Sequence, residues 1–264
     1  ANFRKIIELG DIIIDEAQRG EKSPADISFF AQQYFNNITR SVAPSKKASF
    51  PDFFANNFNP AIEEMKAYAD RLSGFVNLDQ KQFFSPGLYV IGATPAAGKT
   101  TFCWQLLEQL AQRGESCIFC SYEMSQLELF SKSLARELFK RVPSTDLTAA
   151  DIRRGAHSIQ LANIINDFSN SKLNLSILEL QDESIDELLS LLKPFCYDKA
   201  KAPVICLDYL QIVPSSKDST KLGVDDSVRK LKKFQRDTNS TFIVISSFNR
   251  ANYTQGVSFE SFKE

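Results

Sequence analysis

The chain has 264 residues, of which 43% are hydrophobic and 24% are charged, a balance typical of globular domains. No apolar run approaches the ~20 residues of a membrane span, and charged side chains interrupt the apolar start, so the sequence predicts no membrane contact and no signal peptide. The formal net charge of −1 does not by itself indicate that the protein binds nucleic acid. Any such binding must come from local patches or from assembly.

The five cysteines are an odd number at irregular spacing. This pattern argues against a disulfide framework and favours a reducing, cytoplasmic compartment. Cys117 and Cys120 form a C-x-x-C within an apolar run, where we expect them to be buried residues of a strand. A metal-binding or redox pair is the alternative.

The N-terminal part of the chain carries helical patterns. Residues 3–18 place apolar side chains on a mostly helical period, and Ser23 followed by proline is a helix-start signal. Residues 41–60 contain three prolines and alternate small with aromatic side chains, which is typical of a linker.

A further helix is expected from Pro60, with Asn59 as its cap and Gly74 after its end. We therefore expect residues 1–74 to form a helical segment and linker that precedes a larger domain of residues 75–264. The chain begins with alanine and shows no obvious closing element. We expect it to be a piece of a longer protein, truncated in its C-terminal domain.

From residue 87 onward, short apolar runs alternate with helical patterns. The apolar runs, each typical of a strand buried on both faces, are residues 88–93, 116–123, 173–180, 202–213 and 240–248. The helical patterns include residues 100–114, 125–142, 184–199 and 227–239. Strands that alternate with helices need crossover connections. The sequence predicts an α/β fold with a parallel sheet and helices on both faces.

Residues 93–100, "ATPAAGKT", have the form A-x-x-x-x-G-K-T between a predicted strand and a predicted helix. The small side chains let backbone amides approach phosphate oxygens, and the helix adds the positive end of its dipole. Lys99 would reach the β- and γ-phosphates of ATP, and the Thr100 hydroxyl would ligate Mg²⁺. The predicted nucleotide-binding residues are Thr94, Pro95, Ala96, Ala97, Gly98, Lys99, Thr100 and Thr101. A chance loop of small residues is the alternative.

Two acidic residues follow other predicted strands, and ligands of parallel sheets bind at the carboxyl ends of strands. Asp208 comes after an apolar stretch and would hold Mg²⁺, partly through water. Glu123 lies just before a helix whose Ser125 and Glu128 form a capping box, so its carboxylate is left to polarise a water for attack on the γ-phosphate. The alternatives are a loop-capping aspartate and a solvated turn glutamate.

The last predicted strand also ends in polar residues. Ser247 and Asn249 are the predicted sensors of the γ-phosphate, within a cluster that includes Ser246 and Arg250. A polar strand end without a role in the site is the alternative.

Four segments, "GATPAAGKTTF", "CSYEMSQLEL", "VICLDYLQIV" and "ISSFNRANY", resemble in that order the motifs of the DnaB-like replicative helicases. The segment "LTAADIRRGAHS" is also similar to that family, and the resemblance covers roughly residues 75–264. It implies a RecA-like P-loop NTPase fold. It also implies a ring, normally a hexamer, that hydrolyses ATP between subunits and translocates on single-stranded DNA to unwind duplex DNA, with a primase or initiator protein as a further partner.

By that resemblance, Lys99 and Thr100 are the Walker A pair, Glu123 is the catalytic base and Asp208 is the Walker B acid. Ser247 departs from the family, in which a glutamine usually follows the serine of the fourth motif. The family's trans-acting arginine finger lies further downstream than this chain extends. The helix expected near residues 60–72 is similar to the linker helix that grips the next subunit.

DNA contact is expected from the segment 215–227, which looks flexible and offers Lys217 and Lys221 to phosphates. The charges of residues 228–236 are interpreted instead as the solvated face of a helix.

Two other functions remain open from the sequence. One is an ATPase that remodels or regulates a protein partner without unwinding DNA. The other is a small-molecule kinase, which Glu123 disfavours because a carboxylate at that strand end suits attack by water.

Overall fold

The computed structural model describes residues 2–20, 23–24, 27–28, 31, 49–69, 71–80, 84–196, 201–210, 213 and 220–247. The chain divides into two compact units, Ala1–Ala61 and Ile62–Glu264. Among the described residues, no helix is both long and apolar enough to cross a membrane.

The first unit is helical where it is described. Helix α1 spans Asn2–Arg19 and α3 spans Phe50–Asn56, while α4 spans Phe58–Lys66 and continues into the second unit. The helix expected over residues 3–18 is confirmed. The helix expected from Ser23 lies largely outside the described residues.

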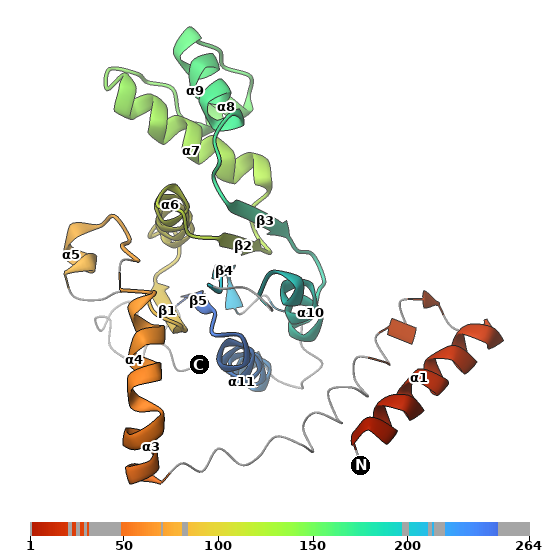
Figure 1. Cartoon of the computed structure of the whole chain (residues 1–264). Coiled ribbons are helices and arrows are strands. Elements are labelled where there is room, and N and C mark those ends of the chain that lie inside the picture. The colour runs from red at the N-terminus through yellow and green to blue at the C-terminus, as the bar shows by residue number, and fades with distance from the viewer. Residues whose placement is uncertain are drawn as a thin grey trace. The chain divides into compact units, whose positions relative to one another are not determined.

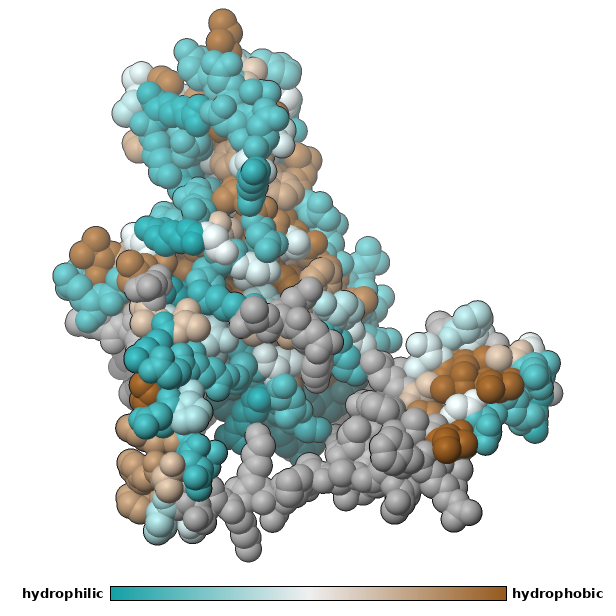
Figure 2. Space-filling view, in the orientation of Figure 1, coloured by the Kyte–Doolittle hydropathy of each residue, from teal (hydrophilic) through white to brown (hydrophobic). Residues whose placement is uncertain are grey.

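The linker predicted over residues 41–60 is wrong for residues 50–60. Phe50, Phe54 and Phe58 recur every four residues, and their rings pack in sequence with centroid distances of 4.9 and 5.2 Å. This spacing is helical, so aromatic contacts along one side of the helices outweigh the local turn signals. All three rings are exposed, and Figure 2 shows hydrophobic surface along this region.

Helix α4 begins two residues before its predicted start and ends at Lys66. The cap position falls on Asn57, whose carbonyl accepts a hydrogen bond from the Ala61 amide (3.0 Å), and not on Asn59. Pro60 lies within the first turn, where amides have no intrahelical acceptor and a missing N–H costs nothing.

Five parallel strands of the second unit form one sheet in the order β1-β5-β4-β2-β3. From β1 to β5 the strands are Gly87–Ala93, Cys117–Ser121, Leu175–Glu179, Val204–Asp208 and Thr241–Ser247. Each lies within or closely matches one of the five predicted apolar runs, so the predicted parallel sheet is confirmed.

Helices cover both faces of this sheet, as predicted. Helix α6 and the start of α7 pack on one face, and α10 and α11 pack on the other (Figure 1). Helices α8 and α9 contact α7. The bounds of α5 to α11 are Val76–Asp79, Lys99–Gln112, Gln126–Arg141, Ala149–Arg153, Ile159–Ser169, Ile185–Cys196 and Thr220–Thr238.

The central strands are apolar on both faces because both faces are covered. In β4, Ile205 and Leu207 contact the α10–α11 side, and Val204 and Cys206 contact the α6 side. Cys117 and Cys120 are likewise buried against opposite layers, since residues three apart in a strand point to opposite faces. The strand interpretation of the C-x-x-C is therefore confirmed.

Helix α11 begins earlier than predicted and takes up part of the segment expected to be flexible. Residues 220–227 are helical, so the loop prediction is wrong there, and Lys221 lies in the first turn of α11. The charges of residues 228–236 were predicted to lie on the solvated face of a helix, and this is confirmed. Leu231 and Phe234 are buried against the sheet, while the Arg229 side chain is largely in solvent.

Arg71, which no sequence pattern singles out, binds the loops at the amino edge of the sheet. Only 1% of this residue is exposed. Its guanidinium donates to Glu115 Oε2 (2.9 and 3.1 Å), to the carbonyls of Phe84 (3.0 Å) and Ala202 (3.2 Å), and to Thr241 Oγ1 (2.7 Å). These four partners lie just before or at the start of β1, β2, β4 and β5, so one side chain fixes the entry of four strands.

The charge of Arg71 is compensated locally. Glu115 also forms an ion pair with Lys201, and the Tyr68 ring lies 4.8 Å from the guanidinium carbon of Arg71. Burial raises the pKa of Glu115, but the hydrogen bonds and charges of Arg71 and Lys201 outweigh burial and hold that pKa below its usual value.

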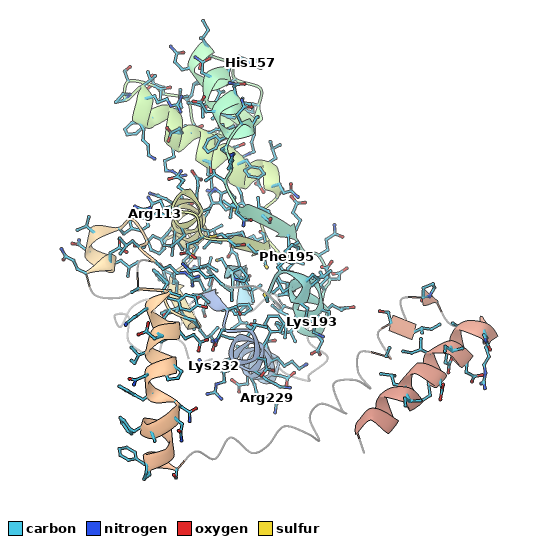
Figure 3. All side chains as sticks on the ribbon, in the orientation of Figure 1. Arg113, His157, Lys193, Phe195, Arg229 and Lys232 are labelled. Carbon is cyan, nitrogen blue, oxygen red and sulfur yellow. The ribbon has the colours of Figure 1, made fainter. Side chains whose placement is uncertain are left out.

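Replacing Arg71 by alanine should lower the free energy of unfolding by about 3–5 kcal/mol, because the change leaves Glu115 as a buried carboxylate without its main partner. Arg229→Ala is the matched control. Arg229 projects from α11 (Figure 3) and pairs with Asp226 at the surface, so its loss should cost less than about 1 kcal/mol. Urea unfolding of both variants measures the difference, and equal effects would contradict the role given to Arg71.

Candidate functional site

Four strands end together at one edge of the sheet. Ala93 at the end of β1 pairs in register with Ser247 at the end of β5, and Ser121 at the end of β2 pairs with Asp208 at the end of β4. The ladder continues one step further, since the Tyr122 amide donates to the Asp208 carbonyl (3.0 Å). The loops that leave these strands therefore start side by side, as a ligand site of a parallel sheet requires.

The loop after β1 turns back on itself before α6 begins. The Ala97 amide donates to the Thr94 carbonyl (3.3 Å), which closes a turn with Pro95 and Ala96 at its centre. Ala96 has φ 61° and Gly98 has φ 86°. A left-handed conformation at a non-glycine residue is strained, by about 1–3 kcal/mol, and such strain is concentrated at functional sites.

Helix α6 begins without a cap. Its N-cap residue, Gly98, has no side chain, and the amides of Lys99, Thr100 and Thr101 find no acceptor in the part of the chain that the structure describes. Helices α7, α8 and α9 differ, because a serine or threonine side chain accepts from the first turn of each. Those caps are Ser125, Thr148 and Ser158. The sequence thus caps these three helices and leaves α6 open.

There is open space around Gly98, the residue directly before the helix. A Cβ placed on Gly98 would meet no described atom within 4 Å. Four adjacent loop residues, 95–98, are exposed. Unpaired amides, the positive end of a helix dipole and open space together fit a phosphate group.

The Lys99 ammonium lies against the start of the same loop. It donates to the carbonyl oxygens of Ala93 and Thr94, each at 3.0 Å. Both acceptors are neutral, so a bound phosphate would be a stronger partner for this charge.

Asp208 is the buried acid of the site. Only 1% of the residue is exposed, and its Oδ2 has no hydrogen-bond partner among the described residues. Burial, together with the smaller effect of the Glu123 charge, raises the pKa of Asp208 to about 6, against the lowering effects of a Thr100 hydrogen bond and the Lys99 charge. An orphaned buried carboxylate oxygen is costly and calls for a cation or a donor.

These residues fit a magnesium ion that is bound together with a nucleotide. Mg²⁺ prefers oxygen ligands and is typically held by one or two carboxylates plus substrate phosphates. Asp208 and the Thr100 hydroxyl supply protein oxygens next to the open end of α6. The described residues contain no cluster of three or more His, Cys, Asp or Glu side chains that could hold a metal ion.

Glu123 is exposed in the turn between β2 and α7. Ser121 Oγ accepts from the Met124 amide (2.9 Å) and shapes this turn. The predicted capping box is present, since Ser125 and Glu128 exchange hydrogen bonds. Glu123 takes no part in that pair, and its charge acts on Asp208, so the two acids lie within electrostatic reach of each other.

The remaining predicted residues are only partly described. Ser247 ends β5 beside Ala93 and is therefore next to the start of the loop. Asn249 and Lys217 lie outside the described residues. Lys221 lies in the first turn of α11.

Two further side chains at this edge carry no sequence signal of their own. Glu179 at the end of β3 accepts from the Gln126 amide and so supplements the cap of α7. Lys132 on α7 donates to Thr101 Oγ1 in the first turn of α6 (3.0 Å). The helical period counted from Ser125 predicts which residues of α7 share a face, but it does not predict that α7 contacts α6.

Comparison with known proteins decides the family. The profile of the DnaB-like helicase C terminal domain matches residues 72–256, which is more than half of the chain. The chain belongs to the DnaB-like helicase family.

Similar members of the DnaB-like family are replicative helicases. A probable replicative DNA helicase of Trieres chinensis is 25% identical over 262 residues, which cover 94% of this chain and 55% of that protein. Replicative DNA helicase DnaB of Pasteurella multocida (strain Pm70) is 27% identical over 183 residues, which cover 67% of this chain and 38% of that protein. The chain thus spans about half the length, or less, of these relatives.

Solved structures support the RecA-like fold of the DnaB-like family. One solved ATPase domain superposes with a TM-score of 0.65 at 21% identity, covering 83% of this chain and 78% of that one. A DnaB-like replicative helicase, described with its interactions with primase, gives a TM-score of 0.62 at 21% identity and covers 97% of this chain and 60% of that one.

Asp208→Asn should stabilise the nucleotide-free protein, and more so at pH 8 than at pH 5. The folded-state pKa of about 6 lies above the unfolded value, so this carboxyl favours folding below about pH 4, and its contribution is lost as the pH rises through 6. At pH 8 the charged group costs at most about 3 kcal/mol, which asparagine avoids.

Asp226→Asn is the control of opposite sign. Hydrogen bonds from Lys230 and Arg229 lower the pKa of Asp226, so this carboxylate favours folding above its unfolded pKa and its loss destabilises at pH 8. Urea unfolding at both pH values compares the two variants. An Asp208→Asn effect that is the same at pH 5 and pH 8 would contradict the burial argument.

Proposed function

We propose that the chain is the ATP-hydrolysing motor domain of a replicative DNA helicase, with residues 75–264 as the ATPase domain. One observation carries the proposal. The uncapped start of α6 lies at the same sheet edge as a buried acid with an unpaired oxygen, in a chain of the DnaB-like family. A bound phosphate would accept hydrogen bonds from the first amides of α6, and its counter-ion would bind the unpaired oxygen of Asp208.

The nucleotide would be held by the loop and the first turn of α6. The amides of Gly98, Lys99 and Thr100 bind phosphate oxygens, and the Lys99 ammonium turns from its two carbonyls to the β- and γ-phosphates. Thr100 and Asp208 would hold Mg²⁺, which would neutralise charge on the phosphates. The residues 94–97 shape the turn that allows this approach.

Glu123 would act as the general base. Its carboxylate is exposed at the strand end next to Asp208, where it can orient a water and accept its proton during attack on the γ-phosphate. Ser247, at the end of the neighbouring strand β5, would sense the γ-phosphate together with Asn249. The hydroxyl of Ser247 is shorter than a glutamine amide, so we propose that this contact runs through a water.

Replacing Glu123 by glutamine should leave nucleotide binding intact and slow ATP hydrolysis by about 100-fold or more, because the base is lost while the phosphate contacts remain. Lys99→Ala is the contrasting variant and should weaken nucleotide binding itself. A fluorescent nucleotide measures binding and phosphate release measures turnover, both on the intact protein. Normal turnover in the Glu123 variant would show that another group is the base.

DNA and a second copy of the chain are the proposed macromolecular partners. We propose a ring, a hexamer by analogy with the family, that translocates on single-stranded DNA. Lys217, which follows β4 in the sequence, and Lys221, in the first turn of α11, would contact DNA phosphates. The exposed phenylalanines of α3 and α4 support self-assembly, because three adjacent rings on one side of a helix pair form an apolar stripe that a neighbouring copy would cover.

Primase is proposed as a further partner, and an initiator protein as an alternative one. The first has a precedent in the DnaB-like helicase whose structure is described with its interactions with primase. We place the protein in the reducing cytoplasm, which is supported by five buried cysteines that are all free.

Single-stranded DNA should stimulate ATP hydrolysis by the full-length protein several-fold, because a motor couples turnover to its track. The measurement is steady-state phosphate release with and without a single-stranded oligonucleotide, at two salt concentrations, since phosphate contacts weaken as salt rises. Turnover that ignores DNA would favour an ATPase that remodels a protein partner.

A further inference from the structure

Tyr122 directly precedes Glu123 and is held through both its main chain and its side chain. Its amide donates to the Asp208 carbonyl (3.0 Å), which extends the pairing of β2 with β4 by one residue. Its hydroxyl donates to the carbonyl of Glu183 (2.7 Å), in the segment between β3 and α10. The ring is half-buried and packs against the cluster that α10 and α11 form with the sheet. This one residue therefore links the ends of β2 and β4 to the segment after β3.

The Tyr122 hydroxyl is suited to a lasting bond of this kind. Burial raises the pKa of the hydroxyl well above the ordinary value of a tyrosine, with smaller contributions from Cys120, Glu183 and Glu187. The group therefore stays protonated and remains a donor. Its partner is a backbone carbonyl, which can only accept, so the direction of the bond is defined.

The acceptor of this bond lies in a segment that is fixed at both ends. At its start, the Leu180 amide donates to the carbonyl of Ser121 (2.8 Å), the last residue of β2. At its end, Glu183 is followed by Ser184, whose amide and hydroxyl donate to Glu187 in the first turn of α10 (2.8 and 2.7 Å). The Glu183 carbonyl is thus held between a strand end and a helix start, which makes it a firm anchor for Tyr122.

The turn that carries Glu123 is also fixed on its other side. The Met124 amide donates to Ser121 Oγ (2.9 Å), and Ser125 opens the capping box of α7. Glu123 itself is exposed and takes no part in these bonds. Its neighbours therefore fix its backbone, with Tyr122 as the contact to the segment after β3, and its carboxylate is left to face the site.

We propose that Tyr122 is a positioning residue for Glu123, and that its bond to the Glu183 carbonyl holds the Glu123 carboxylate where it can accept the proton of the attacking water. The inference rests on the proposed role of Glu123 as the general base. Such a base must lie within hydrogen-bond reach of the proton that it accepts, and a displacement of about 1 Å can slow a reaction by about 100-fold. Tyr122 acts only through Glu123 and touches no reacting atom.

The test measures hydrolysis of bound ATP in a single turnover by the intact protein, so that only folded, nucleotide-loaded molecules contribute to the rate. Tyr122→Phe removes the hydroxyl and keeps the ring. It should slow hydrolysis by about tenfold, because the base is less well placed, and should leave the dissociation constants of MgATP and MgADP unchanged.

Tyr89→Phe is the matched control. The Tyr89 hydroxyl also donates to a backbone carbonyl, that of Ser85 (3.2 Å), but this bond lies near the amino end of β1, away from the site. The control variant should hydrolyse ATP at the wild-type rate. An equal loss in both variants would show that removal of a half-buried hydroxyl is the cause, and would overturn the inference.

A double-mutant cycle with Glu123→Gln separates positioning from a general structural effect. Once the base is gone, the placement of its side chain should no longer matter. Tyr122→Phe combined with Glu123→Gln should therefore hydrolyse ATP at the rate of Glu123→Gln alone. A further loss of about tenfold in the double variant, or weaker nucleotide binding by Tyr122→Phe, would overturn the inference.

The outcomes also distinguish this inference from the proposed function. Wild-type hydrolysis by Tyr122→Phe, together with a slow Glu123→Gln variant, would overturn the role of Tyr122 alone. Normal hydrolysis by Glu123→Gln would overturn the role of Glu123 and this inference with it. Failure of the wild-type protein to bind ATP would overturn the proposed function as a whole.

Discussion

The start of α6 imposes the constraint on which the rest of the site depends. A helix N-terminus presents amides that need acceptors, and this chain gives serine or threonine caps to α7, α8 and α9 while placing Gly98 before α6. The turn that leads there holds Ala96 in a left-handed conformation. Strain costs stability, and first-turn amides without a cap depend on water, so both features fit a position where a ligand binds.

The two edges of the sheet have opposite electrostatic character. At the amino edge, Arg71 is buried with Glu115, and all three nitrogens of its guanidinium donate hydrogen bonds. These bonds fix the entry of four strands. At the carboxyl edge, Asp208 is equally buried but keeps an oxygen that no described residue satisfies. Rigidity at one edge allows an unsatisfied arrangement to persist at the other. We interpret this asymmetry as the physical basis of a pre-formed site.

Much of the fold follows from the sequence, because continuous apolar runs and helical periods are local properties. The five strands, the helices on both faces of the sheet and the capping box at Ser125 were predictable for that reason. Errors arose where side-chain contacts overrode local signals. The phenylalanines at 50, 54 and 58 make a helix from a segment with linker composition, and α11 begins at Thr220, inside a segment whose polar residues indicate a loop.

The residues of the site also divide into those that the sequence predicts and those that it does not. The loop, Asp208 and Glu123 could be placed from the sequence, because each follows a strand and the strands of a parallel sheet end at one edge. Arg71 and Lys132 could not, since each acts across elements that are distant in sequence. Their roles depend on how strands and helices pack, which periodicity does not report.

The central claim is that phosphates bind the open end of α6 and that their metal ion lies between Thr100 and Asp208. A crystal of the protein grown with Mn²⁺ and a non-hydrolysable ATP analogue tests it directly, because manganese accepts the same oxygen ligands and gives an anomalous signal. The account predicts an anomalous peak between the Thr100 hydroxyl and the Asp208 carboxylate, with phosphate density against the amides of Gly98 and Lys99. A nucleotide bound elsewhere, or manganese away from Asp208, would contradict it.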